Sequence, residues 1–173
     1  MCYFIYKDFE KQVMLMNKYM KRADELASEN LKTNDGGPFG ACIVRNGKII
    51  GEGRNTVLRD NDPTAHAEVN AIRNACSKLG THDLSGAAVY TSCYPCPMCM
   101  SALIWANIKT IYYGNTKEDA DDIGFRDDFI YNFFADLKDG TTSEDQPKLI
   151  PMDRDLTLKT FDDYKAKEDK TLY

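Results

Sequence analysis

The chain has 173 residues, 43% of them hydrophobic, which is enough for one domain with a substantial core. Its net charge is −5, and from Lys117 to Tyr173 nine basic residues stand against 16 acidic ones, which disfavours nucleic acid as a partner. No apolar run reaches the roughly 18 residues of a membrane span, and the apolar start from Cys2 to Tyr6 is too short for a secretory signal. We therefore expect a cytoplasmic protein with no membrane contact and with reduced cysteines.

The first part of the chain predicts a helix followed by a hairpin. From Asp8 to Leu31, apolar residues recur every three or four positions, which is typical of an amphipathic helix. Asn34 to Pro38 has the composition of a loop. Strands are expected from Ala41 to Val44 and from Lys48 to Asn55, because they flank Asn46-Gly47, a favoured two-residue hairpin turn.

The middle of the chain alternates helices and strands. We predict a helix from Pro63 to Leu79, a strand from Ala87 to Thr91, a helix from Pro97 to Asn107 and a strand from Thr110 to Gly114. Strand–helix–strand order predicts parallel pairing through right-handed crossovers, and the hairpin adds an antiparallel pair. The expected fold class is therefore α/β with a mixed sheet.

Further helices are expected in the last third of the chain. They run from Asp119 to Asp122, from Asp127 to Leu137 and from Phe161 to Lys170, with a polar loop from Lys138 to Lys148. The helix from Asp127 is expected to bury one face, made of Phe129, Ile130, Phe133 and Phe134. No internal repeat and no linker to a second domain is present, so we expect one domain over residues 1–173.

Two short motifs carry the chemistry: His66-Ala67-Glu68 and Pro95-Cys96-Pro97-Met98-Cys99. One imidazole and two thiolates are three ligands for a tetrahedral zinc ion and leave its fourth position open for water, as in catalytic zinc sites. We predict one zinc ion per chain, bound by His66, Cys96 and Cys99. Glu68 is not needed as a ligand and is free to move protons. Either motif alone has a plainer explanation, as a redox or core cysteine pair or as a helix start.

Local helix geometry agrees with this division of roles. Asp62 is expected to cap a helix whose first residue is Pro63. His66 and Glu68, two positions apart, do not share a helix face, which favours one ligand and one acid–base group. Cys96 and Cys99, three apart, do share a face, and the positive end of their helix favours the thiolate form.

Three stretches resemble the cytidine deaminase superfamily: Gly36–Ala41 (GGPFGA), Asn61–Val69 (NDPTAHAEV) and Thr91–Cys99 (TSCYPCPMC). The spacing H-x-E followed by P-C-x-x-C is the known signature of zinc deaminases acting on nucleobases. Within the superfamily, the chain is most similar to the bacterial guanine deaminases. This similarity includes Gly124–Tyr131 (GFRDDFIY) and a C-terminal tyrosine, and it spans roughly residues 10 to 135.

The resemblance implies a fold, an assembly and a reaction. The fold would be a three-layer α/β/α sandwich around a mixed five-stranded sheet. The assembly would be a homodimer whose C-terminal segments, about residues 138–173, exchange between subunits. The reaction would be zinc-dependent hydrolysis of a nucleobase, guanine plus water giving xanthine plus ammonia, with proton transfer by Glu68. The substrate contacts implied are Phe39, Asn55, Ala67, Trp105, Asp127 and Tyr173.

Alternatives remain at this stage. Phe39 and Trp105 are equally typical of core residues, Asn55 of a turn, Asp127 of a helix cap and Tyr173 of a frayed terminus. The substrate could instead be that of a tRNA adenosine deaminase, or of a cytosine, nucleoside or other aminated-heterocycle deaminase. A zinc-stabilised structural domain is disfavoured, because it would use neither the open zinc position nor Glu68.

Overall fold

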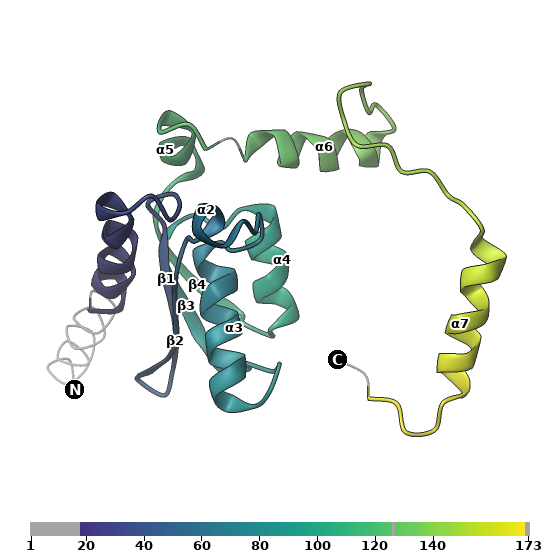
Figure 1. Cartoon of the computed structure of the whole chain (residues 1–173), viewed down its shortest axis with the longest axis horizontal. Helices are drawn as coiled ribbons and strands as arrows, with labels where there is room; N and C mark the ends of the chain where they lie inside the picture. The colour runs from purple at the N-terminus through teal and green to yellow at the C-terminus, as the bar shows by residue number, and fades with distance from the viewer. Residues whose placement is uncertain (1–17, 126, 172–173) are drawn as a thin grey trace, which may run out of the picture. The chain divides into compact units, whose positions relative to one another are not determined.

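The computed structural model describes residues 18–125 and 127–171. The chain divides into two compact units, Met1–Asn132 and Phe133–Tyr173. The described part of the first unit contains the sheet and the helices around it, as Figure 1 shows. No helix among the described residues is long and apolar enough to cross a membrane.

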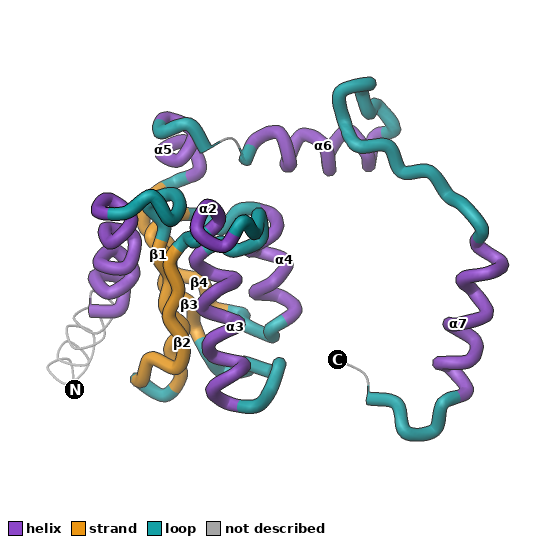
Figure 2. Tube along the Cα trace, viewed as in Figure 1, coloured by secondary structure: helices purple, strands orange, loops and turns teal. Residues whose placement is uncertain are grey.

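The sheet has four strands in the order β2-β1-β3-β4 (Figure 2). The strands are β1 (Gly40–Arg45), β2 (Lys48–Arg54), β3 (Ala88–Cys93) and β4 (Thr110–Asn115). Strand β1 pairs antiparallel with both β2 and β3, whereas β3 and β4 are parallel. Asn46 and Gly47 both have positive φ, 53° and 72°, as a type I′ hairpin turn requires. The predicted hairpin and the mixed α/β sheet are confirmed.

The expectation of five strands is wrong for the described residues, because none after Asn115 joins the sheet. The chain instead turns into helix α5 (Lys117–Asp122) through a capping box: Thr116 Oγ1 accepts from the Asp119 amide and the Asp119 carboxylate accepts from the Thr116 amide. Two further helices follow, α6 (Asp128–Asp139) and α7 (Arg154–Ala166). Helix α7 thus begins earlier than predicted.

Helices lie on both faces of the sheet (Figure 1). Residues 18–29 are helical and continue into the 3₁₀ turn η1 (Asn30–Lys32), which matches the described part of the predicted first helix; residues 8–17 lie outside the described residues. Tyr19 of this helix packs on Cys42, Val44 and Tyr90. On the other face, α3 (Ala67–Leu79) and α4 (Pro97–Trp105) enclose a core that includes Ala41, Ile43, Val89 and Leu103.

Helix α3 begins at Ala67, so the predicted start at Pro63 is wrong. The Asp62 carboxylate accepts bonds from the amide and the hydroxyl of Thr64, at 2.8 and 2.6 Å, which closes a side-chain turn instead of a helix. His66 is extended, with φ −71° and ψ 159°, and is the residue that precedes the first helical turn. The short helix α2 (Val57–Asp60) lies just before this turn.

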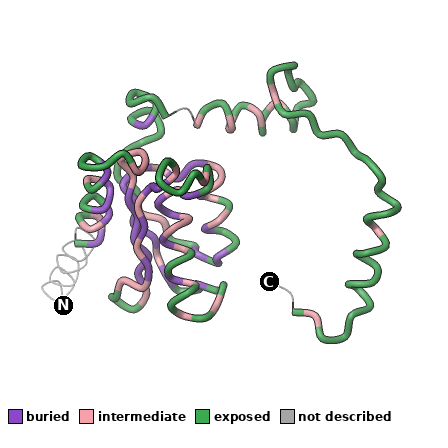
Figure 3. Tube along the Cα trace, viewed as in Figure 1, coloured by how far each residue is buried: buried purple, intermediate pink, exposed green. Residues whose placement is uncertain are grey.

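The predicted buried face of α6 is not buried: Ile130 and Phe133 are half-buried, and Phe129 and Phe134 are exposed. No described residue of α6 is buried, and Phe129 and Phe134 are 51% and 56% exposed. In the second unit, α7 also has no buried residue (Figure 3). An apolar face becomes buried only where another element packs on it.

A glycine allows α3 to approach β2 closely. A Cβ atom at Gly53 would lie 2.3 Å from the Ala67 carbonyl oxygen and 2.5 Å from the Ala71 amide nitrogen. Both are backbone atoms, so a larger residue would have to displace the start of α3.

We predict that Gly53→Ala lowers the free energy of unfolding by about 1–3 kcal/mol, the usual cost of overpacking a core. Urea unfolding measures this, with Lys48→Ala, an exposed change on the same strand, as the control. An unchanged midpoint for Gly53→Ala would contradict the close approach.

Candidate active site

The start of α3 and the start of α4 bring three metal-binding side chains together. His66 is the N-cap residue of α3, and Cys96 is the N-cap residue of α4, with Pro97 as the first helical residue. Cys99 lies in the first turn of α4. Each cysteine Sγ is 3.6 Å from His66 Nδ1, and the three ligand atoms all lie within 4.8 Å of one another.

These distances fit one tetrahedral zinc ion. With Zn–S of about 2.3 Å and Zn–N of about 2.0–2.1 Å, the N···S edge of a tetrahedron is about 3.6 Å. The observed separations match this edge, and one imidazole with two thiolates is an ordinary zinc donor set. Among residues 18–125 and 127–171, the group of side chains that could hold a metal ion is His66, Cys96 and Cys99, as the sequence predicts.

The surroundings favour a negative charge on the Cys96 sulfur, whereas the hydrogen bond to Cys96, together with burial, raises the pKa of the Cys99 thiol. Hydrogen bonds from Cys99 and from His66 lower the pKa of the Cys96 thiol, although burial opposes this shift. The same contact with Cys96 raises the pKa of His66. The amide end of α4 adds a positive partial charge at the two cysteines. Cys96 is therefore the cysteine of the pair that these contacts favour as a thiolate.

Glu68 is close to the metal-binding cluster but is not part of it. It is the second residue of α3 and is 6% exposed, and its Oε1 accepts a hydrogen bond of 3.1 Å from Thr91 Oγ1. Burial raises the pKa of this carboxyl group above its usual value. A carboxylate with a raised pKa takes up a proton more readily than an exposed one, which suits a general acid–base group.

A cavity of about 270 Å³ opens beside these groups. Phe39 and Phe125 form part of its wall, with an edge-to-face contact and ring centroids 4.8 Å apart. A Cβ atom at Gly37 would lie 2.5 Å from the Phe125 ring, so a larger residue at this position would displace that ring. The residues that line the cavity are Gly36, Gly37, Phe39, Asn55, Val57, Leu58, Pro63, His66, Glu68, Cys93, Tyr94, Cys96, Ala120, Phe125 and Asp127.

The predicted substrate contacts divide into two groups. Phe39, Asn55 and Asp127 line the cavity together with His66, Glu68 and Cys96. Ala67 is fully buried at the start of α3, and Trp105, at the end of α4, is 68% exposed; neither lines the cavity formed by the described residues. Tyr173 lies outside the described residues.

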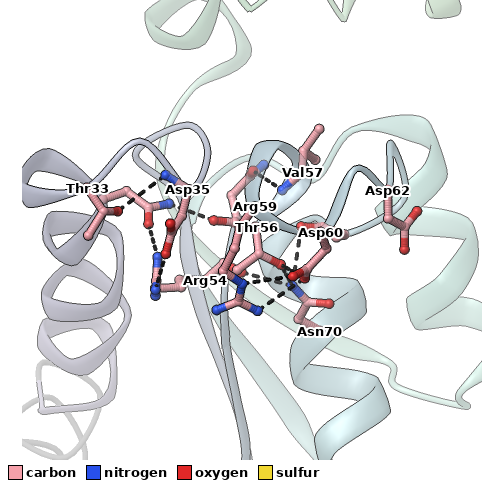
Figure 4. A network of polar contacts seen from close by, with 12 residues as sticks. Thr33, Asp35, Arg54, Thr56, Val57, Arg59, Asp60, Asp62 and Asn70 are labelled. Carbon is pink, nitrogen blue, oxygen red and sulfur yellow. Dashed lines mark hydrogen bonds and ion pairs between the residues drawn. The ribbon is translucent and has the colours of Figure 1, made fainter.

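A polar network holds the loops at the cavity (Figure 4). Arg54 forms an ion pair with Asp35 at 2.5 Å, which ties the end of β2 to the loop before β1. Thr56 donates to Asp60 at 2.7 Å and accepts from Asn70 of α3 at 2.9 Å. These bonds flank Asn55, whose backbone amide donates to the Phe39 carbonyl oxygen at 3.0 Å. The backbone around Asn55 is therefore fixed from both sides.

Phe125 and Thr91 were not predicted as site residues. Gly124, with φ +92°, ends α5 in a Schellman motif: its amide donates to Asp121, and the Phe125 amide donates to Ala120. A glycine followed by an apolar residue after a helix, as in Gly124-Phe125, is a pattern that can be recognised in the sequence. No local pattern indicates the role of Thr91, because its partner Glu68 belongs to another element.

A cluster of one half-buried histidine and two buried cysteines beside a spare glutamate, next to a mixed β-sheet, is typical of the active site of zinc-dependent deaminases. Residues 14–115 match the cytidine and deoxycytidylate deaminase zinc-binding region, and the chain belongs to this family.

Relatives within the family differ in substrate. A guanine deaminase of Bacillus subtilis is 53% identical over 113 residues, which cover 65% of this chain and 72% of that protein. The X-ray structure of guanine deaminase from Bacillus subtilis matches with a TM-score of 0.83 at 41% identity, covering 91% of this chain and 98% of the other. A tRNA-specific adenosine deaminase of Haemophilus influenzae is 32% identical over 154 residues, 88% of this chain and 86% of that protein.

We predict that purified protein carries close to one zinc ion per chain and that Cys96→Ala or Cys99→Ala loses it, because two ligands bind zinc far more weakly than three. Elemental analysis measures the metal, and circular dichroism checks the fold. Cys93→Ala is the matched control, since Cys93 Sγ contacts the Thr116 carbonyl oxygen instead of the cluster. Zinc loss from the Cys93 variant alone would contradict the assignment.

Proposed function

We propose that the protein hydrolyses guanine to xanthine and ammonia, as a zinc-dependent hydrolase. The observation that carries this proposal is the match to Bacillus subtilis guanine deaminase, which extends over 91% of this chain. The cavity supports it, because Glu68 and Asp127 line it together with the metal ligand His66. Guanine presents N–H donors at its edge, and a carboxylate such as Asp127 accepts from such donors.

The reaction needs a nucleophile and a proton carrier. A zinc ion held by His66, Cys96 and Cys99 would supply the first, because coordination lowers the pKa of water to about 7. Glu68 takes the proton of the attacking water and delivers it to a ring nitrogen. It then takes the proton of the hydroxyl group that has been added to the ring carbon and passes it to the departing amine, so that the C–N bond breaks, ammonia leaves and a carbonyl oxygen remains. Burial keeps Glu68 away from bulk water during these transfers.

Substrate recognition would use the groups around the cavity. Phe39 and Phe125 would bound the planar ring, and Asn55 and Asp127 would supply its polar partners. A base that lacks the matching donors would leave these buried polar groups unpaired, which penalises it strongly. Ala67 would contribute at the start of α3, next to Glu68.

We further propose the homodimer with exchanged C-terminal segments and the three-layer α/β/α arrangement that the family resemblance implies. Support comes from apolar side chains that this chain leaves exposed, among them Trp105, Ile150, Met152, Leu156 and Phe161, which are 68–76% exposed. Several large exposed apolar side chains on one segment, such as residues 150–161, are typical of a contact surface. Tyr173 would then act at the site of the neighbouring subunit, and Trp105 stays a proposed substrate contact.

The proposed role of Glu68 gives a direct prediction. Glu68→Ala should retain zinc but lose about 10²–10⁴-fold in guanine turnover, the usual effect of removing a general acid–base group. Ammonia release measures turnover, and Glu52→Gln, on β2 and paired with Arg22, is the control. Zinc loss in Glu68→Ala would make Glu68 a ligand instead.

The substrate class is tested in the same assay. The wild-type protein is assayed on guanine, guanosine, cytosine, adenine, adenosine and a tRNA stem-loop. Guanine should be the best substrate. Deamination of the stem-loop without reaction on free bases would contradict the proposal and favour the tRNA-specific activity named for the Haemophilus relative.

The exchange of tails predicts complementation. Deleting Leu172 and Tyr173 should reduce guanine turnover with zinc content unchanged. Mixing this truncated chain with full-length Glu68→Ala should restore activity, because a mixed dimer pairs an intact Glu68 with the partner's tail. No recovery in dimers proven to be mixed would contradict exchange of the tail between subunits.

A further inference from the structure

Thr91 is a polar residue in the centre of the sheet. It is 1% exposed and lies on β3, paired with Ala41 of β1 on one side and with Tyr113 of β4 on the other. Its hydroxyl donates to Glu68 Oε1 at 3.1 Å. Polar side chains at such depth are retained only with a partner, since an unpaired one loses its hydration without compensation. The partner here is the carboxylate that the proposed mechanism uses.

The sheet fixes the direction of this hydroxyl. Side chains alternate along a strand, so Thr91 points to the same face as Val89, which packs in the core under α3. Threonine is branched at Cβ and has few rotamers in a strand. The pairing on both sides holds its backbone in register. Thr91 is therefore a rigid donor aimed at the first turn of α3.

Glu68, by contrast, has a long side chain at the start of a helix. Three rotatable bonds precede its carboxylate, so burial alone does not select one orientation. A bond at Oε1 removes this freedom and leaves Oε2 for the reacting water and the substrate. A fixed proton carrier transfers protons faster than one that samples several rotamers.

We propose that Thr91 is a positioning residue that anchors Glu68 for proton transfer; this rests on the proposed deaminase function. The competing explanation is purely structural: Thr91 satisfies a buried oxygen and contributes only to folding. The two explanations differ in which kinetic constant changes and in whether the effect depends on Glu68.

The experiment uses the full-length, zinc-loaded protein. Thr91→Val keeps the shape but removes the hydroxyl, and kcat should fall about 10- to 100-fold, as expected for loss of a hydrogen bond to a charged group. KM should stay within about twofold, because substrate contacts are unchanged. Thr91→Ser keeps the donor and should recover most of the activity.

Ser92→Ala is the matched control. Ser92 is the next residue of the same strand and accepts a buried hydrogen bond of 3.1 Å from the Gly40 amide, and alternation along the strand directs its side chain to the face opposite that of Thr91. Ser92→Ala removes a hydrogen bond that is about as buried as the one from Thr91 to Glu68. This change should leave kcat unchanged. An equal fall in kcat for Ser92→Ala and Thr91→Val would overturn the positioning role in favour of general destabilisation.

A double-mutant cycle with Glu68→Ala completes the test. Thr91→Val should have no further effect on residual turnover once Glu68 is absent, and the two changes should also be non-additive in urea unfolding. Additive effects in both cycles overturn the proposal. If wild-type protein releases no ammonia from guanine, the proposed function fails, and the unfolding cycle still decides whether Thr91 anchors Glu68.

Discussion

His66 and Cys96 occupy equivalent places, each directly before the first turn of a helix, and the contact between α3 and α4 brings these two places together. The amide ends of both helices then face the same point, where they favour negatively charged sulfur. Cys99 follows one turn into α4, and the three ligand atoms converge without distortion of either helix. The geometry of the metal site is thus set by the positions at which helices α3 and α4 begin.

The rest of the first unit keeps these helix starts in place. Gly53 lets the backbone of α3 lie against β2, and the Arg54–Asp35 ion pair ties the adjoining loop to the end of that strand. Glu68 is buried in this arrangement, one helical residue beyond Ala67, and Thr91 of β3 reaches it across the core. The carboxylate therefore depends on α3 for its place and on the central strand for its orientation.

Local patterns in the sequence predicted what depends on short-range geometry. The Asn46-Gly47 turn, the parallel pair around α4 and the three metal ligands follow from spacing alone. The start of α3 was mispredicted because Asp62 bonds to Thr64 in a turn, and cap and turn residues are of the same type. The number of strands and the exposed face of α6 could not be predicted, because burial depends on which elements pack together. For the same reason, the contact of Thr91 with Glu68 could not be predicted from the sequence.

X-ray absorption at the zinc edge tests the central claim, that three side chains from two helix starts bind the metal while Glu68 stays free. The wild-type protein should show two sulfur atoms at about 2.3 Å, one imidazole nitrogen at about 2.0–2.1 Å and one further light atom. The spectrum of Glu68→Ala should be the same. A first shell with three sulfur atoms, or one that changes when Glu68 is removed, would contradict the account.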